Sequence, residues 1–188
     1  PAPADANNAD ALVTTLRDRA DAQINAEIDA IFERGWALFQ TGDCAGAVEA
    51  MDAMFAVRDN TTRHAAQAAR VYQCQARTLA ETKAYSQAIT LGLQAEQLNP
   101  DSEVIRTDLT NWFIAQGQVE YNARHWEEAA AQFQFALERD ATNLAARRSF
   151  GRVILSANLS YMLVGVVCLA VFIVVSSYRS RTRRGLSG

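Results

Sequence analysis

The hydrophobic and polar positions of this chain follow two different patterns. Up to about residue 152, apolar side chains recur at intervals of three and four residues, the spacing that places them on one face of a helix. Residues 153–178, VILSANLSYMLVGVVCLAVFIVVSSY, are instead a run of twenty-six residues without a charge. The first pattern predicts a domain of packed amphipathic helices, and the second predicts a helix in uniformly apolar surroundings.

The distribution of proline and alanine also favours helices. The only prolines are Pro1, Pro3 and Pro100, so residues 4–99 contain none. A proline inside a helix costs about 3 kcal/mol, and alanine, which is abundant here, has the highest helix propensity. We therefore predict an all-α fold. Residues 1–10 are expected to be a polar, flexible lead, and residues 11–27 an N-terminal capping helix.

The uncharged segment is long enough to cross a membrane. A helix rises about 1.5 Å per residue, so roughly twenty apolar residues span the hydrocarbon core of a bilayer. A buried core helix is the alternative, but it needs only about 10–14 apolar residues. We predict one transmembrane helix over residues 153–178 and a basic tail over residues 179–188. The residues expected at the membrane interface are Tyr161, Tyr178, Arg179, Arg181, Arg183 and Arg184.

Three segments between residues 28 and 150 align at a constant spacing of 41 residues. Each segment reads as a helix, a short turn and a second helix. Small residues recur in register, and close helix crossings require small side chains, so we predict that these positions are buried where two helices meet. They are Gly35, Ala76 and Gly117 in the first helices, and Ala47, Ala88 and Ala129 in the second helices.

This pattern resembles the tetratricopeptide repeat (TPR). The third segment matches it through Gly117, Trp126, Ala129, Phe133 and Ala136. The usual period of that family is 34 residues, so each link here is about seven residues longer, which predicts lengthened first helices. The resemblance implies an α-solenoid of three helix–turn–helix units over residues 28–152.

In TPR proteins the first helices line a concave groove, so the resemblance implies a site for a peptide segment of a partner protein. An alternative for the three aromatic candidates is that they pack beneath the N-terminal helix. Phe32 and Trp36 occupy places where chaperone-binding members carry lysine and asparagine, which disfavours a carboxylate clamp. The candidate residues are Phe32, Trp36, Phe39, Gln73, Arg77, Asn111, Ile114, Gln118 and Asn122.

Charge and reactive residues exclude several function classes. Residues 1–152 hold all 21 acidic residues and 14 of the 18 basic ones, so the main body lacks the basic stripe that nucleic acids require. The two histidines and three cysteines have no metal-ligand spacing, and no catalytic group or phosphate loop is apparent. We expect no enzyme activity, cofactor or metal.

Two of the cysteines leave an open alternative. Cys44 and Cys74 would meet if their helices are neighbours, and an oxidising compartment would then join them. Isolated cysteines are also common as small buried hydrophobic residues.

These observations lead to the hypothesis of a non-enzymatic, membrane-anchored adaptor that binds other proteins. Its layout is similar to the tail-anchored mitochondrial fission receptor family and to plant outer-membrane import receptors, which implies a mitochondrial membrane. Four basic residues lie on each side of the span, so charge does not predict its orientation. One alternative is an accessory structural subunit of a large membrane complex, such as a respiratory or ATP-synthase assembly. Another is a bacterial periplasmic repeat protein with a C-terminal anchor, which requires removal of a signal sequence.

Overall fold

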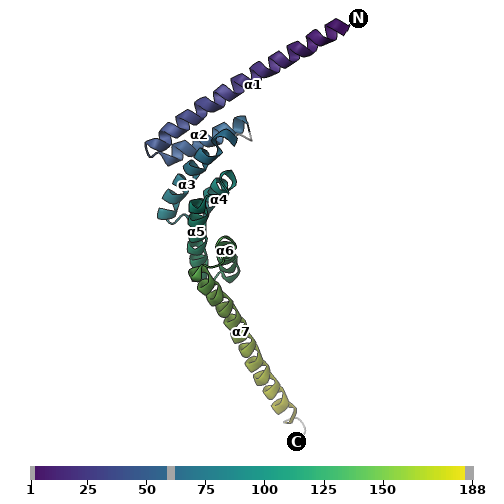
Figure 1. Cartoon of the computed structure of the whole chain (residues 1–188). Helices are drawn as coiled ribbons and strands as arrows, with labels where there is room; N and C mark the ends of the chain where they lie inside the picture. Colours follow the sequence, from purple (N-terminus) through teal and green to yellow (C-terminus); the bar gives the residue numbers. More distant parts are fainter. Residues whose placement is uncertain (1–2, 59–61, 185–188) are drawn as a thin grey trace. The chain divides into compact units, whose positions relative to one another are not determined.

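The computed structural model describes residues 3–58 and 62–184, and its side chains over 10–58, 63–159 and at several positions up to Val171. All regular elements in these ranges are helices, which confirms the all-α prediction (Figure 1). They are α1 (Pro3–Gln40), α2 (Cys44–Val57), the short 3₁₀ helix η1 (Thr62–His64), α3 (Ala65–Glu81), α4 (Tyr85–Leu98), α5 (Glu103–Asn122), α6 (Trp126–Arg139) and α7 (Leu144–Arg184).

The 41-residue repeat is visible in the helix boundaries. The first helices of the three pairs end at Gln40, Glu81 and Asn122, and the second helices begin at Cys44, Tyr85 and Trp126. Both sets are spaced by 41 residues, and each second helix has 14 residues. The three predicted helix–turn–helix pairs are therefore present as α1/α2, α3/α4 and α5/α6.

The three turns share one backbone conformation. The second residue after each first helix has a left-handed backbone conformation, with φ of 89° at Gly42 and 65° at both Lys83 and Arg124. The next backbone N–H donates to the carbonyl five residues earlier, as in a Schellman motif. These bonds are Asp43 to Leu38 at 3.0 Å, Ala84 to Leu79 at 2.9 Å and His125 to Glu120 at 2.9 Å. The repeat is thus a repeat of turn geometry, of which only the first copy carries a glycine.

The described chain divides into two compact units, with the boundary inside α5. Unit 1 ends at Trp112 and unit 2 begins at Phe113. In unit 1, α2 packs against α1 and α3, and α3 packs against α4. Gly35 allows the close approach of α1 and α2, because a Cβ there would lie 2.8 Å from the Cβ of Ala50. In unit 2, α6 packs against α7, and its core is Ala129, Phe133 and Val153.

The small residues that recur in the sequence are buried, as predicted. The four alanines of this set have no exposed surface, and the two glycines are also buried. A Cβ at Gly117 would lie 2.8 Å from the ring of Phe133, so the third pair depends on a glycine at this position. The buried positions are Gly35, Ala47, Ala76, Ala88, Gly117 and Ala129.

The ends of the described chain differ from the predicted boundaries. α1 is one helix from Pro3, so it includes most of the expected flexible lead, the capping helix and the first repeat helix. A proline is tolerated in the first turn, and no later proline interrupts this helix. α7 is also continuous, so no break separates residues 144–152 from the uncharged segment.

The membrane prediction falls largely on residues that the structure describes incompletely. Among the residues it does describe, no helix combines the length and hydropathy needed to cross a bilayer. The side chains expected at the membrane interface lie outside the described ones: Tyr161, Tyr178, Arg179, Arg181, Arg183 and Arg184.

Candidate functional site

Unit 1 contains a groove of about 350 Å³ between the exposed face of α3 and the end of α1. Phe39 is the contribution of α1. The other six lining residues come from α3 at the spacing of one helical face (i, i+3, i+4, i+7, i+8, i+11), which is why they face the same groove. They are Arg70, Gln73, Cys74, Arg77, Thr78 and Glu81.

Aromatic rings form the α1 side of the site. Trp36 stacks on Phe39 with ring centroids 4.9 Å apart. The guanidinium carbon of Arg70 lies 5.5 Å from the centre of the Trp36 ring and 5.7 Å from that of Phe39, so this cation rests on the aromatic pair. No carboxylate among the described residues forms an ion pair with Arg70. The Arg70 guanidinium therefore keeps hydrogen-bond donors available to a ligand.

Phe32 belongs to the core rather than to the groove. It is 6% exposed, and its ring stacks on His64 of η1 with centroids 3.8 Å apart. Asp29 holds this histidine through a contact of 3.0 Å between its Oδ1 and His64 Nε2, and it also pairs with Arg63. The hydrogen bond to His64 and the charge of Arg63 lower the pKa of the Asp29 carboxyl below its ordinary value.

A carboxylate from α5 fixes the polar side of the groove. Asp108 Oδ2 accepts from Gln73 Nε2 at 2.6 Å and from Arg77 Nε at 2.8 Å. The Asp108 side chain is only 19% exposed, so it neutralises the Arg77 charge at a partly dehydrated position. Asp108 thus orients two groove residues and leaves Arg70 as the arginine of this groove without a carboxylate partner.

A disulfide connects the wall of the groove to α2. Cys44, the first residue of α2, is bonded to Cys74 of α3, and their Cα atoms are 5.7 Å apart. Cys74 also lines the groove. The first of the two alternatives for these cysteines is therefore the one found, and the bond ties the start of α2 to the wall of the site.

A second, more polar hollow of about 330 Å³ lies where α2, α3 and α4 meet. The Tyr72 hydroxyl donates to Asp52 Oδ1 at 2.5 Å. Burial and the neighbouring Asp52 carboxylate raise the pKa of Tyr72 above its ordinary value. The bond stabilises the contact between α2 and α3, and nothing else in this hollow marks a ligand site.

The predicted site residues fall into three groups. Phe39, Gln73 and Arg77 line the groove of unit 1, with Trp36 beside it under Arg70. Phe32 is in the core, and Asn111 is exposed on α5. The remaining three residues belong to unit 2. Ile114 packs against its core, and Gln118 donates a hydrogen bond of 3.0 Å to Asn122.

Four lining residues were missed by the sequence prediction. Arg70, Cys74, Thr78 and Glu81 were not among the candidates, although they continue the face that contains Gln73 and Arg77. Their spacing of three and four residues along α3 places them on the same helical face as Gln73 and Arg77, and this is the signal in the sequence that could have identified them. No group of three histidine, cysteine, aspartate or glutamate side chains that would hold a metal occurs in the described part of the chain.

Comparisons with known proteins found similarity at the level of structure only. No family model matches the chain, and no curated protein matches its sequence. The first TPR domain of Spaghetti (RPAP3) bound to the HSP90 peptide SRMEEVD is similar with 16% identity and a TM-score of 0.35, over 70% of this chain and 93% of that one.

Two further TPR structures give comparable values. The Arabidopsis OM64 TPR domain has 18% identity and a TM-score of 0.34, over 68% of this chain and 94% of its own. The second TPR domain of human RPAP3, in complex with the HSP70 peptide SGPTIEEVD, has 18% identity and a TM-score of 0.32, over 69% and 97%. Similarity at these values does not establish a family, so the architecture rests on the chain's own helix pairs.

Proposed function

We propose that this chain is a membrane-anchored, non-enzymatic adaptor that binds a segment of a partner protein in the groove of unit 1. The observation that carries the proposal is the α3 face itself. Six of its side chains line one open groove, and the aromatic pair Trp36 and Phe39 stands at its edge. Stacked aromatic rings and an arginine are the residues that most often contribute binding energy at protein interfaces.

The groove offers both kinds of contact that an extended or helical peptide uses. Phe39 supplies apolar surface, and Arg70 supplies hydrogen-bond donors whose orientation is fixed by the rings beneath it. The disulfide and the Asp108 contacts hold the α3 wall in place before a ligand arrives. A site that is already ordered loses less conformational entropy on binding.

A photo-cross-linker placed in the groove tests this part of the proposal. Benzoylphenylalanine in place of Thr78 lies inside the groove, and the same group in place of the exposed Gln87 on α4 is the matched control. We expect a discrete protein adduct from position 78 in cells and none of the same mass from position 87. Identical adducts from both positions would contradict a binding role for the groove.

Anchoring is supported by the continuity of α7 and by its sequence. The helix runs from packed residues of unit 2 through the uncharged segment to Arg184 without a break. The segment has no charge over twenty-six residues, and four arginines follow it. We expect the full chain to remain with membranes after alkaline carbonate extraction and to float with vesicles. Release into the soluble fraction would contradict the anchor.

The disulfide bears on the compartment of unit 1. Disulfides persist in oxidising environments and are rare in the cytosol. The Cys44–Cys74 bond therefore favours a helical domain that faces an oxidising space, such as the mitochondrial intermembrane space or a periplasm. Alkylation of intact cells with a thiol-reactive polymer, before and after reduction, tests this by the mass shift of the two cysteines.

A second candidate is an accessory structural subunit of a large membrane complex. The observation in its favour is the exposed apolar surface of α7, where Leu155 is 70% and Met162 68% exposed. Native-gel separation after gentle solubilisation distinguishes the candidates. Quantitative migration in one assembly of fixed stoichiometry favours the subunit, and migration alone or with substoichiometric partners favours the adaptor.

A further inference from the structure

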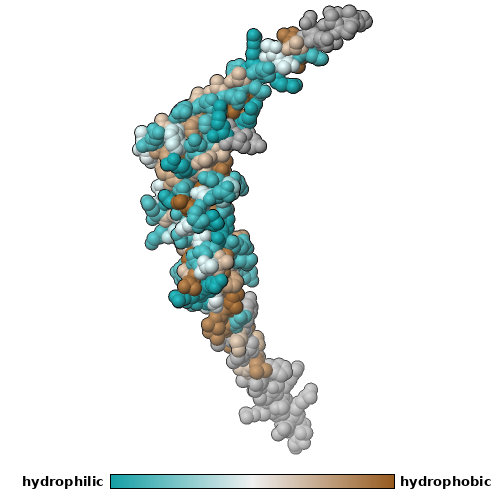
Figure 2. Space-filling model, in the orientation of Figure 1, coloured by the Kyte–Doolittle hydropathy of each residue, from teal (hydrophilic) through white to brown (hydrophobic). Residues whose placement is uncertain are grey.

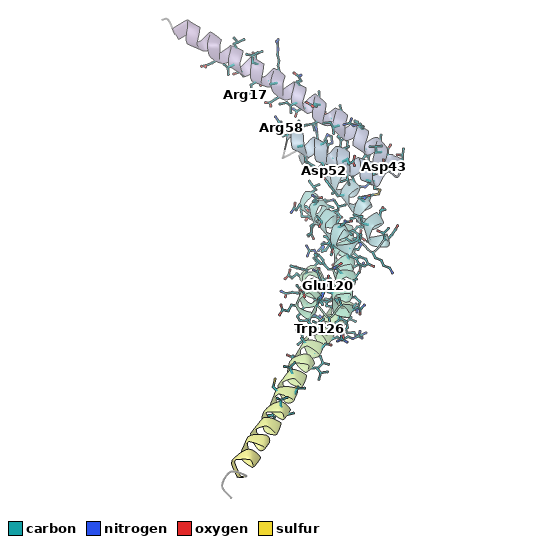
Figure 3. All side chains as sticks on the ribbon, turned by 180° about the vertical axis from the view of Figure 1, so that it is seen from behind. Arg17, Asp43, Asp52, Arg58, Glu120 and Trp126 are labelled. Carbon is teal, nitrogen blue, oxygen red and sulfur yellow. A yellow bond between two sulfur atoms is a disulfide. The ribbon has the colours of Figure 1, made fainter. Side chains whose placement is uncertain are left out.

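Unit 2 contains a groove of about 450 Å³ beside the point where α7 leaves the other helices. The turn between α5 and α6 and the first turn of α6 form one wall, and residues 153–157 of α7 form the other. Figure 3 labels Trp126 at this place. The lining of the groove includes Arg124, Trp126, Glu127, Glu128, Val153 and Ala157.

Among the described residues, the packing of α7 against the rest of unit 2 reaches as far as this groove. Val153 is fully packed, with Trp126 against it, and the Tyr121 hydroxyl lies 3.2 Å from the Ser156 hydroxyl. Immediately beyond, Leu159 is 55% and Met162 68% exposed. Figure 2 shows hydrophobic surface over this part of α7. The groove therefore adjoins the exposed apolar surface of α7.

The groove combines an apolar wall with charged residues of both signs. Trp126, Val153 and Ile154 provide the apolar surface. His125 Nδ1 lies 2.9 Å from Glu120 Oε2, whereas no described carboxylate forms an ion pair with Arg124. Arg124 is thus a cation of this groove without a described carboxylate partner, and Glu127 and Glu128 are acidic residues of the same groove.

We propose that this groove lies at the bilayer surface and binds a zwitterionic phospholipid. Arg124 would pair with the phosphate, Glu127 and Glu128 with the positively charged ammonium group of the headgroup, and Trp126 with the upper part of an acyl chain. The inference rests on the membrane anchor proposed above. It adds a lipid site formed by residues of the helical domain together with the first residues of the uncharged segment, Val153, Ile154 and Ala157.

Distance along α7 agrees with this placement. Ala157 precedes Tyr161, the start of the most apolar stretch, by four residues, which is about 6 Å of helix. The headgroup layer on each side of a bilayer is roughly 5–8 Å thick. A helix that enters the hydrocarbon near Tyr161 therefore holds the lower edge of the groove at headgroup level.

Fluorescence quenching by brominated lipid tests the proposal on the full-length chain. Replacement of Trp36 and Trp112 by phenylalanine leaves Trp126 as the single tryptophan. In vesicles that contain phosphatidylcholine brominated near the top of its acyl chains, we expect loss of roughly half of the Trp126 emission, since an interfacial ring contacts these positions. The same single-tryptophan chain in vesicles of unbrominated phosphatidylcholine is the control. Equal Trp126 emission in the two kinds of vesicle would contradict the site.

Lipid selectivity tests the charge pattern. Brominated phosphatidylcholine should quench Trp126 more than the same fraction of brominated phosphatidylglycerol, and E127Q/E128Q should remove that preference while circular dichroism is unchanged. Equal quenching by both lipids in the parent chain would overturn the zwitterionic assignment.

Vesicle flotation separates failure of this inference from failure of the anchor. A chain that does not float with vesicles lacks the anchor. A chain that floats but keeps an unquenched Trp126 has the anchor without the lipid site, which would overturn the inference and leave the groove to a protein partner.

Discussion

Units 1 and 2 are built from the same 41-residue repeat but differ in what their grooves offer. In unit 1 the groove is lined by one face of a first helix, α3, and is stabilised by a disulfide and an ion pair with Asp108. In unit 2 the groove lies at the turn before a second helix and is walled by apolar residues of α7. The repeat thus fixes where helices cross and turn, whereas the exposed faces decide what is bound.

Removal of the largest buried side chain of unit 2 is expected to have the largest effect. Phe133 is fully buried against Gly117, Ala129 and Val153, so Phe133→Ala should destabilise unit 2 by about 3–5 kcal/mol. Hydrogen exchange measured by mass spectrometry should show faster exchange in α6. Equal acceleration in α2 would mean that the two units unfold together and would contradict their independence.

Loss of the disulfide should affect unit 1 alone. The bond closes a segment of 30 residues between Cys44 and Cys74, and a loop of this size contributes about 3–4 kcal/mol in the chain-entropy account. Denaturant unfolding of the oxidised chain, the reduced chain and C44S/C74S measures the effect. We expect reduction to lower the stability of α2 and α3 and to leave hydrogen exchange in α6 unchanged.

The three left-handed turns give a matched series across both units. Lys83→Gly and Arg124→Gly should each stabilise the chain by about 1 kcal/mol, because a non-glycine residue at positive φ is strained. Gly42→Ala should cost a similar amount. Thermal unfolding of the three variants checks this prediction. A loss of stability in Lys83→Gly would show that the Lys83 side chain stabilises the fold by more than the strain at its positive φ costs.

Acid should weaken the contact between α1 and η1 by a small amount. The pKa of Asp29 is lowered in the folded chain, chiefly by its hydrogen bond to His64, from an ordinary value of 3.8. The stabilisation is therefore full above about pH 3.8 and is lost as the pH falls through the lower folded value. Asp29→Asn should be less stable than the parent at neutral pH. The difference in stability between the two chains should shrink as the pH falls below about 3.8. A difference that stays constant over this range would contradict the pairing.

The repeat positions were predictable because they depend on local spacing. Gly35, Ala88 and Ala129 lie in register in the sequence, and the structure buries all of them. The turn conformation was harder to predict. Of the three residues with positive φ, one in each turn, only Gly42 is of a type that adopts positive φ readily. Lys83 and Arg124 adopt it because the helix pairs on either side require it.

The groove was only partly predictable for a different reason. Gln73 and Arg77 follow from the helical face, but Arg70 is an exposed charged residue whose sequence does not reveal the Trp36 and Phe39 rings beneath it. The boundary between the two units inside α5 depends on contacts between residues that are distant in the sequence. The periodicity of apolar residues therefore does not predict it. The predicted groove residues on α5 were therefore assigned to one surface although they belong to two units.

The adaptor function is tested most directly by the affinity of a partner segment for variants of the unit 1 groove. The segment cross-linked through position 78 would be synthesised and titrated against the full chain in detergent. We expect Phe39→Ala and Arg70→Ala each to weaken binding about tenfold or more, with Gln87→Ala as an unchanged control. Unchanged affinity in both groove variants, with their helical content intact, would contradict the adaptor function.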